Sequence, residues 1–187
     1  MWYAETMGAR VIGLAGWSGS GKTTLLTKLL PLLTSQGLKV STVKRAHHEF
    51  DVDLPGKDSY EHRRAGASEV IVSSSSRWVQ MHELGGEPEL TLGQLLRRMS
   101  PCDLIVVEGF KRERHPKLEV FRAVLAKPLL HPEDSRIVAI ASDQPVEAAV
   151  PVVGLDDVAA VARLVYEKAE PLDVVLAALE GAHGSAL

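Results

Sequence analysis

The sequence predicts an α/β protein with a three-layer α/β/α arrangement around a mainly parallel sheet, and with a candidate β-hairpin extension over residues 69–83. Two observations support this fold class. Short apolar runs alternate with segments of helical periodicity along most of the 187 residues. A glycine-rich segment links the first apolar run to the first helical one. We expect one domain over residues 1–187, with a core over residues 10–169 and a short C-terminal helix and tail over residues 170–187.

The first three elements are the most clearly marked. Residues 10–16 form an apolar run that ends in glycine, which predicts a buried strand. Residues 21–35 are predicted to be a helix packed on a sheet, because leucines recur at positions 25, 26, 29, 30 and 33. Gly37 is placed to end this helix as a C-terminal cap. The short, β-branched segment 39–44 predicts the next strand.

The same reasoning extends along the rest of the chain. Residues 45–58 contain Pro55, Gly56 and several charges, so we expect a functional loop there. The remaining patterns predict helices over residues 58–67, 91–99, 156–169 and 170–179, and strands over residues 69–73, 77–83, 103–107, 117–125 and 136–141. The serine run 73–76 is predicted to be a solvated turn, and residues 181–187 a frayed tail.

Composition narrows the classes of function. The net charge of −3 argues against a nucleic-acid binder, whose surface is usually basic. No apolar run approaches the ~20 residues that cross a bilayer, so we expect no membrane association. The N-terminal residues lack a signal-peptide pattern, and Cys102 is the single cysteine, which excludes an intrachain disulfide. These features favour a cytoplasmic protein.

Residues 16–23, Gly-Trp-Ser-Gly-Ser-Gly-Lys-Thr, match the phosphate-loop pattern G-x-x-x-x-G-K-[ST] without a mismatch. A strand before them and an amphipathic helix after them predict a P-loop NTPase fold and a single P-loop nucleotide-binding domain. The glycines let backbone N–H groups turn toward phosphate oxygens, and the helix start adds unpaired amides. Lys22 would reach the β- and γ-phosphates, and the Thr23 hydroxyl would ligate Mg²⁺. The alternative is a Gly/Ser-rich turn without a ligand. The predicted phosphate-binding residues of the loop are Gly16, Ser18, Gly19, Ser20, Gly21, Lys22 and Thr23.

Acidic residues at two places are candidates for the magnesium side of the site. Glu108 follows the predicted strand 103–107, at a position where an aspartate is commoner. Direct ligation, contact through water and orientation of water are open roles for it, beside the alternative of a solvent-facing carboxylate. In the loop after the second strand, Asp53 is preferred over Asp51 for metal contact or water placement. The catalytic candidates are therefore Lys22, Asp53 and Glu108, and the metal candidates are Thr23, Asp53 and Glu108.

Other polar residues near these positions have simpler interpretations. His47 and His48 are adjacent in an extended segment and so point to opposite faces, which favours polar contacts to a partner over a transition-metal site. Asp103 lies at the far end of its strand and is expected to be structural. The mixed-charge segment 111–115 is predicted to be a solvent loop, with an anion contact as the alternative. No physical reason for Trp17 inside the loop follows from the sequence.

Several segments share a pattern with one known family, and they are residues 15–26, 43–48, 51–60, 64–67, 77–78, 107–111 and 141–143. Together they resemble the MobB family, the GTP-binding adapter proteins of molybdopterin-guanine dinucleotide biosynthesis. The likeness runs over about residues 11–168. The phosphate loop alone is generic, whereas the stretch around Asp53 and Pro55 and the Glu-Gly-Phe-Lys stretch at residues 108–111 are much more specific.

The resemblance implies a cytoplasmic homodimer that uses GTP and Mg²⁺, hydrolyses GTP weakly and assists the guanylyltransferase MobA in joining GMP to molybdopterin. It implies that Asp53 and Glu108 line the metal side. It also implies phosphate and magnesium binding by Gly19, Gly21, Lys22, Thr23 and Thr24. Direct binding of molybdopterin is left open. An edge strand within residues 69–83 or 117–125 could pair between the subunits.

Guanine selectivity has a separate candidate residue. The chain lacks the N-K-x-D motif of the common GTPases. Asp143 follows the predicted strand 136–141, where a base-reading loop would lie, and its carboxylate could accept hydrogen bonds from guanine N1–H and the N2 amine. The alternative is ordinary turn chemistry.

Two other functions compete with the adapter. A small-molecule kinase could use the same loop, because phosphoryl transfer needs mainly positioning and charge stabilisation. Such an enzyme usually has a lid with arginines, for which Arg112 and Arg114 are weak candidates. A nickel-carrying metallocentre GTPase would need a cysteine–histidine site, and Cys102 has no histidine close by in the sequence. The adapter is favoured.

Overall fold

The computed structural model describes residues 8–46 and 50–183 of the chain. The chain divides into two compact units. The main unit comprises Met1–Arg45 and Leu92–Leu187, and the insert unit comprises Ala46–Thr91. That both units act as one nucleotide-binding domain stays a prediction.

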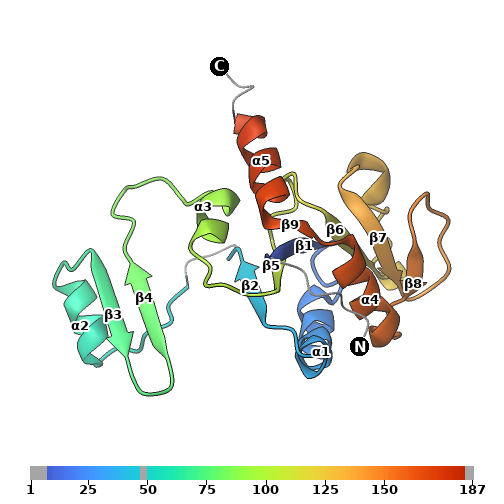
Figure 1. The fold of residues 1–187 in the computed structure, drawn as a ribbon. Helices are drawn as coiled ribbons and strands as arrows, with labels where there is room; N and C mark the ends of the chain where they lie inside the picture. Colours follow the sequence, from blue (N-terminus) through green and yellow to red (C-terminus); the bar gives the residue numbers. More distant parts are fainter. Residues whose placement is uncertain (1–7, 47–49, 184–187) are drawn as a thin grey trace. The chain divides into compact units, whose positions relative to one another are not determined.

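A mainly parallel sheet forms the centre of the main unit (Figure 1). Its strands are β1 Arg10–Ala15, β2 Val40–Lys44, β5 Leu104–Glu108, β6 Lys117–Phe121, β7 Ile137–Ser142, β8 Val152–Gly154 and β9 Glu170–Pro171. The order is β2-β5-β1-β6-β7-β8, with all these neighbours parallel, and β9 pairs antiparallel with β1. The parallel sheet expected from the alternating pattern is confirmed.

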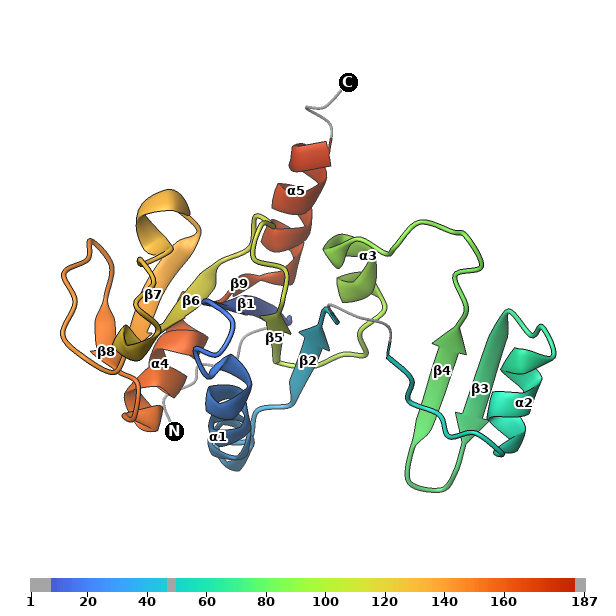
Figure 2. The same cartoon turned by 180° about the vertical axis from the view of Figure 1, so that it is seen from behind.

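The central strands are apolar because they are covered on both sides. In β1 and β5 nearly every residue is buried, as continuous apolar runs predict for strands inside a parallel sheet. On one face, α1 (Lys22–Ser35) and α4 (Val158–Lys168) bury leucines and valines against the sheet. On the other face lie α3 (Leu92–Arg97) and α5 (Leu172–His183), which share a core with Val11 and Ile105 (Figure 2). The three-layer α/β/α prediction is thus confirmed.

The strand order places a ligand-binding position at the end of β1. After β1 the chain builds β2 and β5 on one side of it, and then β6, β7 and β8 on the other side. In open parallel sheets, ligands bind beyond the carboxyl ends of the strands at such a reversal. The segment at this point is the glycine-rich loop after Ala15, with β5 and β6 as its flanking strands.

The insert unit contains α2 (Asp58–Arg64) and an antiparallel pair, β3 (Glu69–Ser73) and β4 (Trp78–His82). This pair confirms the expected β-hairpin. In the turn between the strands, the Ser74 hydroxyl accepts hydrogen bonds from the backbone N–H groups of Ser76 and Arg77, and the serine run is exposed as expected.

Some boundaries differ from the sequence-based expectation. Strand β6 ends at Phe121 rather than at residue 125, because the chain turns into the 3-10 helix Ala123–Leu125 and continues through Ala126 at φ 48°. A second 3-10 turn covers His131–Glu133. Strand β8 was not predicted, since it has only three residues. Helix α5 reaches His183, so residues 181–183 are helical and not part of the frayed tail that the sequence predicted.

The position of β6 corrects one further expectation. This strand pairs with β1 on one side and with β7 on the other, so it is not an edge strand and cannot pair between subunits. Three buried polar residues lie in or just before this strand, namely His115, Lys117 and Glu119. Burial lowers the pKa of His115 to about 3, so the ring is neutral inside the sheet. The prediction that residues 111–115 form a solvent loop is therefore wrong at His115.

These buried groups hold the second 3-10 turn and the residues on either side of it. Lys117 Nζ donates to Asp134 Oδ2 at 3.0 Å. The Glu119 carboxylate accepts from the backbone N–H groups of Leu130 and His131 at 2.7 and 2.9 Å. Burial of a charge is costly unless it is paired, and these contacts supply the partners.

In the part of the chain that the structure describes, no helix is long and apolar enough to cross a membrane.

Candidate functional site

The glycine-rich loop curls tightly around the end of β1. Gly16 has φ 138°, and a Cβ atom there would lie 2.5 Å from the Val120 carbonyl oxygen, so only glycine fits between the loop and β6. Gly19 and Gly21 also have positive φ, at 80° and 89°. The Ser20 N–H donates to the Trp17 carbonyl at 3.1 Å, which closes the turn. The backbone therefore has the conformation that a phosphate cradle requires.

Helix α1 begins directly after this turn. Gly21 is its N-terminal cap, and its first turn consists of Lys22, Thr23 and Thr24. The first helical bond runs from Leu25 N–H to Gly21 O at 2.8 Å, so the amides before Leu25 have no acceptor within the helix. These amides and the positive end of the helix dipole favour an anion at this position.

Lys22 lies over the loop. Its Nζ donates to the carbonyls of Gly16 and Trp17 at 2.9 and 3.0 Å. Burial lowers the pKa of Lys22, the charge on Glu108 acts in the opposite direction, and Lys111 and Lys44 lower it further. Several cations thus share a small region around one carboxylate, which is an environment suited to a polyanion.

Glu108 and Thr23 are 85 positions apart in the sequence, and the fold brings their side chains into contact. The Thr23 hydroxyl donates to Glu108 Oε1 at 2.8 Å, and Lys44 Nζ lies 4.0 Å from the same oxygen. The sheet register explains the meeting, because Glu108 is aligned with Leu14 in β1 and with Lys44 in β2. A hydroxyl and a carboxylate in contact are oxygen donors of the kind that Mg²⁺ prefers.

The turn after β5 also needs glycine. Gly109 has φ 101°, and a Cβ atom there would lie 3.0 Å from Cβ and 3.1 Å from the carbonyl oxygen of Arg45. The Arg45 N–H donates to the Glu108 carbonyl at 2.9 Å, so the ends of β2 and β5 are bonded together. This packing fixes the backbone that carries the Glu108 side chain, and it accounts for glycine after that residue.

The structure also gives a reason for Trp17. Its indole N–H donates to the Pro128 carbonyl at 2.8 Å. The ammonium groups of Lys111 and Lys127 each lie 5.7 Å from the centre of its ring, within the range of cation–π attraction. Trp17 therefore fastens the loop to residue 128 and gathers two cations beside it. Sequence reasoning missed this role, since its partners lie about a hundred residues away.

Arg122 is a second residue at the loop that sequence reasoning missed. Its Nε donates to the Ser20 carbonyl at 3.2 Å, and a Cβ atom on Gly21 would lie 3.3 Å from that nitrogen. Asp143, at the end of β7, accepts from the Ala123 N–H at 3.0 Å, and its other oxygen lies 4.0 Å from Arg122 Nη1. A basic residue just beyond a strand that adjoins β1 is the signal that could have identified Arg122. It was missed because the predicted strand 117–125 included Arg122, whereas β6 ends at Phe121.

The other predicted loop residues have the accessibility that ligand contact requires, with one exception. Ser18, Gly19 and Thr24 are exposed on the loop and the first helical turn. The Ser20 side chain is buried, and its hydroxyl lies beneath the loop, 2.7 Å from where a Cβ atom on Gly16 would be. Ser20 can therefore contribute its backbone to the ligand, while its hydroxyl is buried beneath the loop.

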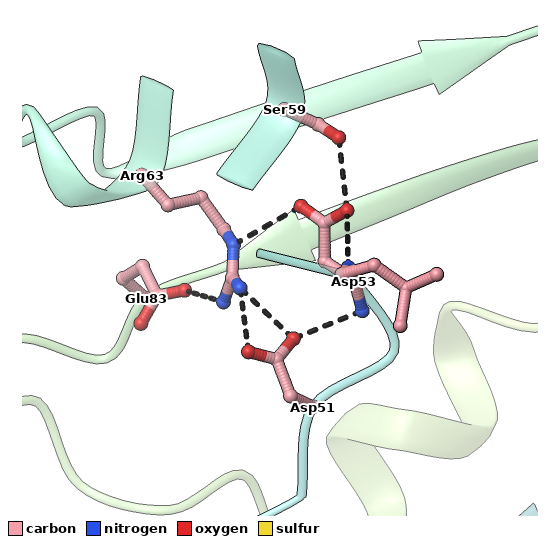
Figure 3. Close-up of polar contacts among 6 residues, drawn as sticks. Asp51, Asp53, Ser59, Arg63 and Glu83 are labelled. Carbon is pink, nitrogen blue, oxygen red and sulfur yellow. Dashed lines mark hydrogen bonds and ion pairs between the residues drawn. The ribbon is translucent and has the colours of Figure 1, made fainter. Parts of the chain in front are cut away.

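Asp53 belongs to the insert unit, where Arg63 organises its surroundings (Figure 3). One carboxylate oxygen of Asp53 accepts from the Ser59 hydroxyl at 3.0 Å, and the other lies 3.6 Å from Arg63 Nε. Arg63 Nη2 also donates to both carboxylate oxygens of Asp51, and Arg63 Nη1 donates to Glu83 Oε1. The loop that carries Asp53 is therefore held in shape within its own unit, and the metal role of Asp53 stays a prediction.

The residues considered for competing functions are placed elsewhere. His47 and His48 lie outside the described residues. Asp103 Oδ2 accepts from the Lys39 N–H at 2.7 Å, which confirms its structural role at the start of β5, and Cys102 precedes it at the end of the sheet away from the loop. Within residues 8–46 and 50–183, no cluster of three or more histidine, cysteine or acidic side chains could hold a metal.

Comparison with known proteins matches residues 11–143 to the family model of molybdopterin guanine dinucleotide synthesis protein B, MobB. This chain belongs to the MobB family. It is 45% identical over 84% of its length to the molybdopterin-guanine dinucleotide biosynthesis adapter protein of Escherichia coli, and covers 91% of that protein. The corresponding protein of Haemophilus influenzae is 43% identical over 73% of this chain and 76% of its own. A crystal structure of molybdopterin-guanine biosynthesis protein B superposes with a TM-score of 0.68 at 27% identity, over 84% of this chain and 97% of the other.

The match to the MobB model covers every site residue described above. It begins in β1 and ends at Asp143, so it includes the phosphate loop, Glu108 and Arg122 as well as the insert unit. The resemblance that the sequence suggested is therefore confirmed. Helices α4 and α5 lie beyond the matched residues and contribute to the two cores of the main unit.

Proposed function

We propose that this chain binds GTP with Mg²⁺ on residues 16–24 and acts as an adapter in the biosynthesis of molybdopterin-guanine dinucleotide. The observation that carries the proposal is the contact between Thr23 and Glu108 beside Lys22, in a chain of the MobB family. Its relatives in Escherichia coli and Haemophilus influenzae are named as adapter proteins of this pathway. The partner enzyme would be the guanylyltransferase MobA, and the setting would be the cytoplasm.

The residues present fit a magnesium triphosphate. The loop amides and the start of α1 would hold the β- and γ-phosphates, and Lys22 would turn from the loop carbonyls to phosphate oxygens. Thr23 and Glu108 would hold Mg²⁺, directly or through water, and Asp53 would place a water or contact the metal. The bound Mg²⁺ would neutralise charge on the phosphate oxygens. We expect hydrolysis of GTP to be weak, as the resemblance to the MobB family implies.

Two titrations test the nucleotide part of the proposal. Purified protein is titrated calorimetrically with GTP and separately with ATP, both with Mg²⁺. We expect GTP to bind at least about tenfold more tightly than ATP, a difference of ~1.4 kcal/mol. ATP preference would contradict the guanine-nucleotide adapter. Release of a nucleoside diphosphate that depends on an added acceptor would instead support a small-molecule kinase.

The adapter part is tested by capture of purified MobA on the immobilised protein, with GTP and without nucleotide. We expect retention that changes with GTP, since an adapter that responds to its nucleotide must bind its partner differently in the two states. In a parallel experiment, the immobilised protein is incubated with molybdopterin in the absence of MobA. Retention of molybdopterin would indicate direct binding and not binding through MobA. Equal retention with and without GTP would contradict a nucleotide-sensitive adapter.

The hairpin of the insert unit is the candidate surface for a homodimer. Among the described residues, each of its two strands pairs only with the other, and Ile71 and Trp78, on the same face, are 62% and 63% exposed. We predict that the double substitution Ile71→Lys and Trp78→Lys weakens self-association at least about tenfold, because it places two charges on an apolar contact. Light scattering over a range of concentrations measures the mass in solution.

A matched substitution controls for the added charge. Val124, in the main unit, is 82% exposed, and Val124→Lys should leave the mass in solution unchanged. A parent protein that is monomeric at all concentrations would contradict the dimer. A dimer that survives the double substitution would place the interface on another surface.

A further inference from the structure

Arg122 makes contacts in two directions at the candidate nucleotide site. It follows the last residue of β6, and its Nε donates to the Ser20 carbonyl of the phosphate loop at 3.2 Å. On its other side, Nη1 lies 4.0 Å from Asp143 Oδ2. One half-buried guanidinium therefore lies between the loop that would hold phosphates and the carboxylate that is the candidate reader of guanine.

The Asp143 carboxylate is held by two consecutive residues. Its Oδ1 accepts from the Ala123 N–H at 3.0 Å, while Oδ2 faces Arg122. The 3-10 turn Ala123–Leu125 fixes the direction of that N–H, because it bends the chain sharply after β6. Both oxygens are thus oriented by the end of β6, and the side chain of Asp143 keeps 26% of its surface accessible to a ligand.

The chemistry of the two groups suits this arrangement. An arginine is charged at every physiological pH and presents donors in a rigid planar fork, so it can orient a carboxylate and hold a carbonyl at once. Each carboxylate oxygen has two lone pairs, which leaves Asp143 able to accept from a ligand while it is held. A positioned acceptor pair is what the N1–H and N2 amine of guanine would require, and adenine offers no such pair of donors at the same edge.

Arg122 also limits what can stand at Gly21. A Cβ atom on that glycine would lie 3.3 Å from Arg122 Nε, and the residue has φ 89°. The guanidinium of Arg122 therefore lies against the turn from which α1 starts.

We propose that Arg122 is a specificity-determining positioning residue, which holds Asp143 in place for guanine and ties that carboxylate to the phosphate loop through Ser20. The inference rests on the proposed binding of GTP. It assigns guanine selectivity to Arg122 and Asp143, which follow the ends of β6 and β7. The N-K-x-D motif of common GTPases is missing from the chain.

The test compares the affinities for GTP and ATP, with Mg²⁺, among the parent, Arg122→Ala, Arg122→Lys, Asp143→Asn and the double variant Arg122→Ala/Asp143→Asn. We expect Arg122→Ala to lower the GTP-over-ATP preference about tenfold while ATP affinity changes less than about threefold. Lysine should restore part of the preference, since it keeps the charge but lacks the fork. The double variant should have the preference of Asp143→Asn alone, because residues that act through one contact are not additive.

The outcomes separate the inference from the function on which it rests. A parent without GTP preference would overturn both. A parent with GTP preference that Arg122→Ala retains would overturn the inference alone, as would equal weakening of GTP and ATP or additive losses in the double variant. Arg97→Ala, which removes an exposed arginine paired with Glu180 on the helices α3 and α5, controls for the loss of one positive charge and should leave the preference unchanged.

Discussion

Replacing Lys22 by alanine is expected to weaken the binding of the magnesium triphosphate by a factor of about a hundred or more, without unfolding the chain. Charge-assisted hydrogen bonds contribute roughly 1.5–3 kcal/mol each, and a lysine at this position would make such bonds to more than one phosphate oxygen. The fold should be unaffected, because Lys22 Nζ donates to two carbonyls of the loop and the core of α1 is formed by its leucines. Calorimetric titration gives the affinity, and thermal unfolding gives the stability.

The matched control is Lys28→Ala. Lys28 is an exposed lysine on the same helix, so the substitution removes the same charge away from the loop. We expect its affinity to equal that of the parent. Unchanged affinity in Lys22→Ala would remove the phosphate-binding assignment of the loop. A fall of the melting temperature in Lys22→Ala that matches the loss of affinity would instead give the residue a structural role.

Replacing Glu108 by glutamine is expected to raise the Mg²⁺ concentration for half-maximal nucleotide binding about tenfold or more, and to slow hydrolysis. Glutamine has the same length and can still accept the hydrogen bond from the Thr23 hydroxyl, so the local geometry is retained. What is lost is a negative charge next to Lys22 and Lys44, and a cation held by oxygen ligands depends on that charge. Mg²⁺ titrations at fixed GTP measure the shift.

Glu147→Gln serves as the comparison for this substitution. Glu147 is exposed in the main unit, and neutralising it should leave the Mg²⁺ titration where it is. If Glu108→Gln and the parent gave identical titrations, the Thr23–Glu108 contact would be structural only. A shift with Asp53→Asn of similar size would add the insert unit to the metal site, as the sequence predicted.

The parts of the site that the sequence predicted are those encoded locally. The phosphate loop needs eight consecutive residues between a strand and a helix, and both neighbours were evident from apolar periodicity. Glu108 was predicted because parallel strands end at one edge of the sheet, so a carboxylate just after a buried strand meets the loop after another. Its contact with Thr23 agrees with this reasoning.

The parts that the sequence did not reveal depend on pairings between distant segments. Arg122 became visible only once β6 was placed beside β1 and was seen to end at Phe121. The role of Trp17 could be inferred only once Pro128, Lys111 and Lys127 were placed beside its ring. Strand β8 is too short for its pattern to differ from that of a loop. In the sequence, the charged residues of β6 suggest a surface strand. They are buried in the structure because a segment that comes later in the chain covers them.

Gly13 in β1 and the buried His115 are two positions whose substitutions should depend on each other. A Cβ atom on Gly13, in β1, would lie 2.3 Å from His115 Nε2, just before the chain enters β6. Any larger residue at position 13 would need a smaller one at position 115, since the histidine is fully buried and has no room to withdraw. Among related sequences the two positions should therefore change together, and single exchanges at either should be selected against.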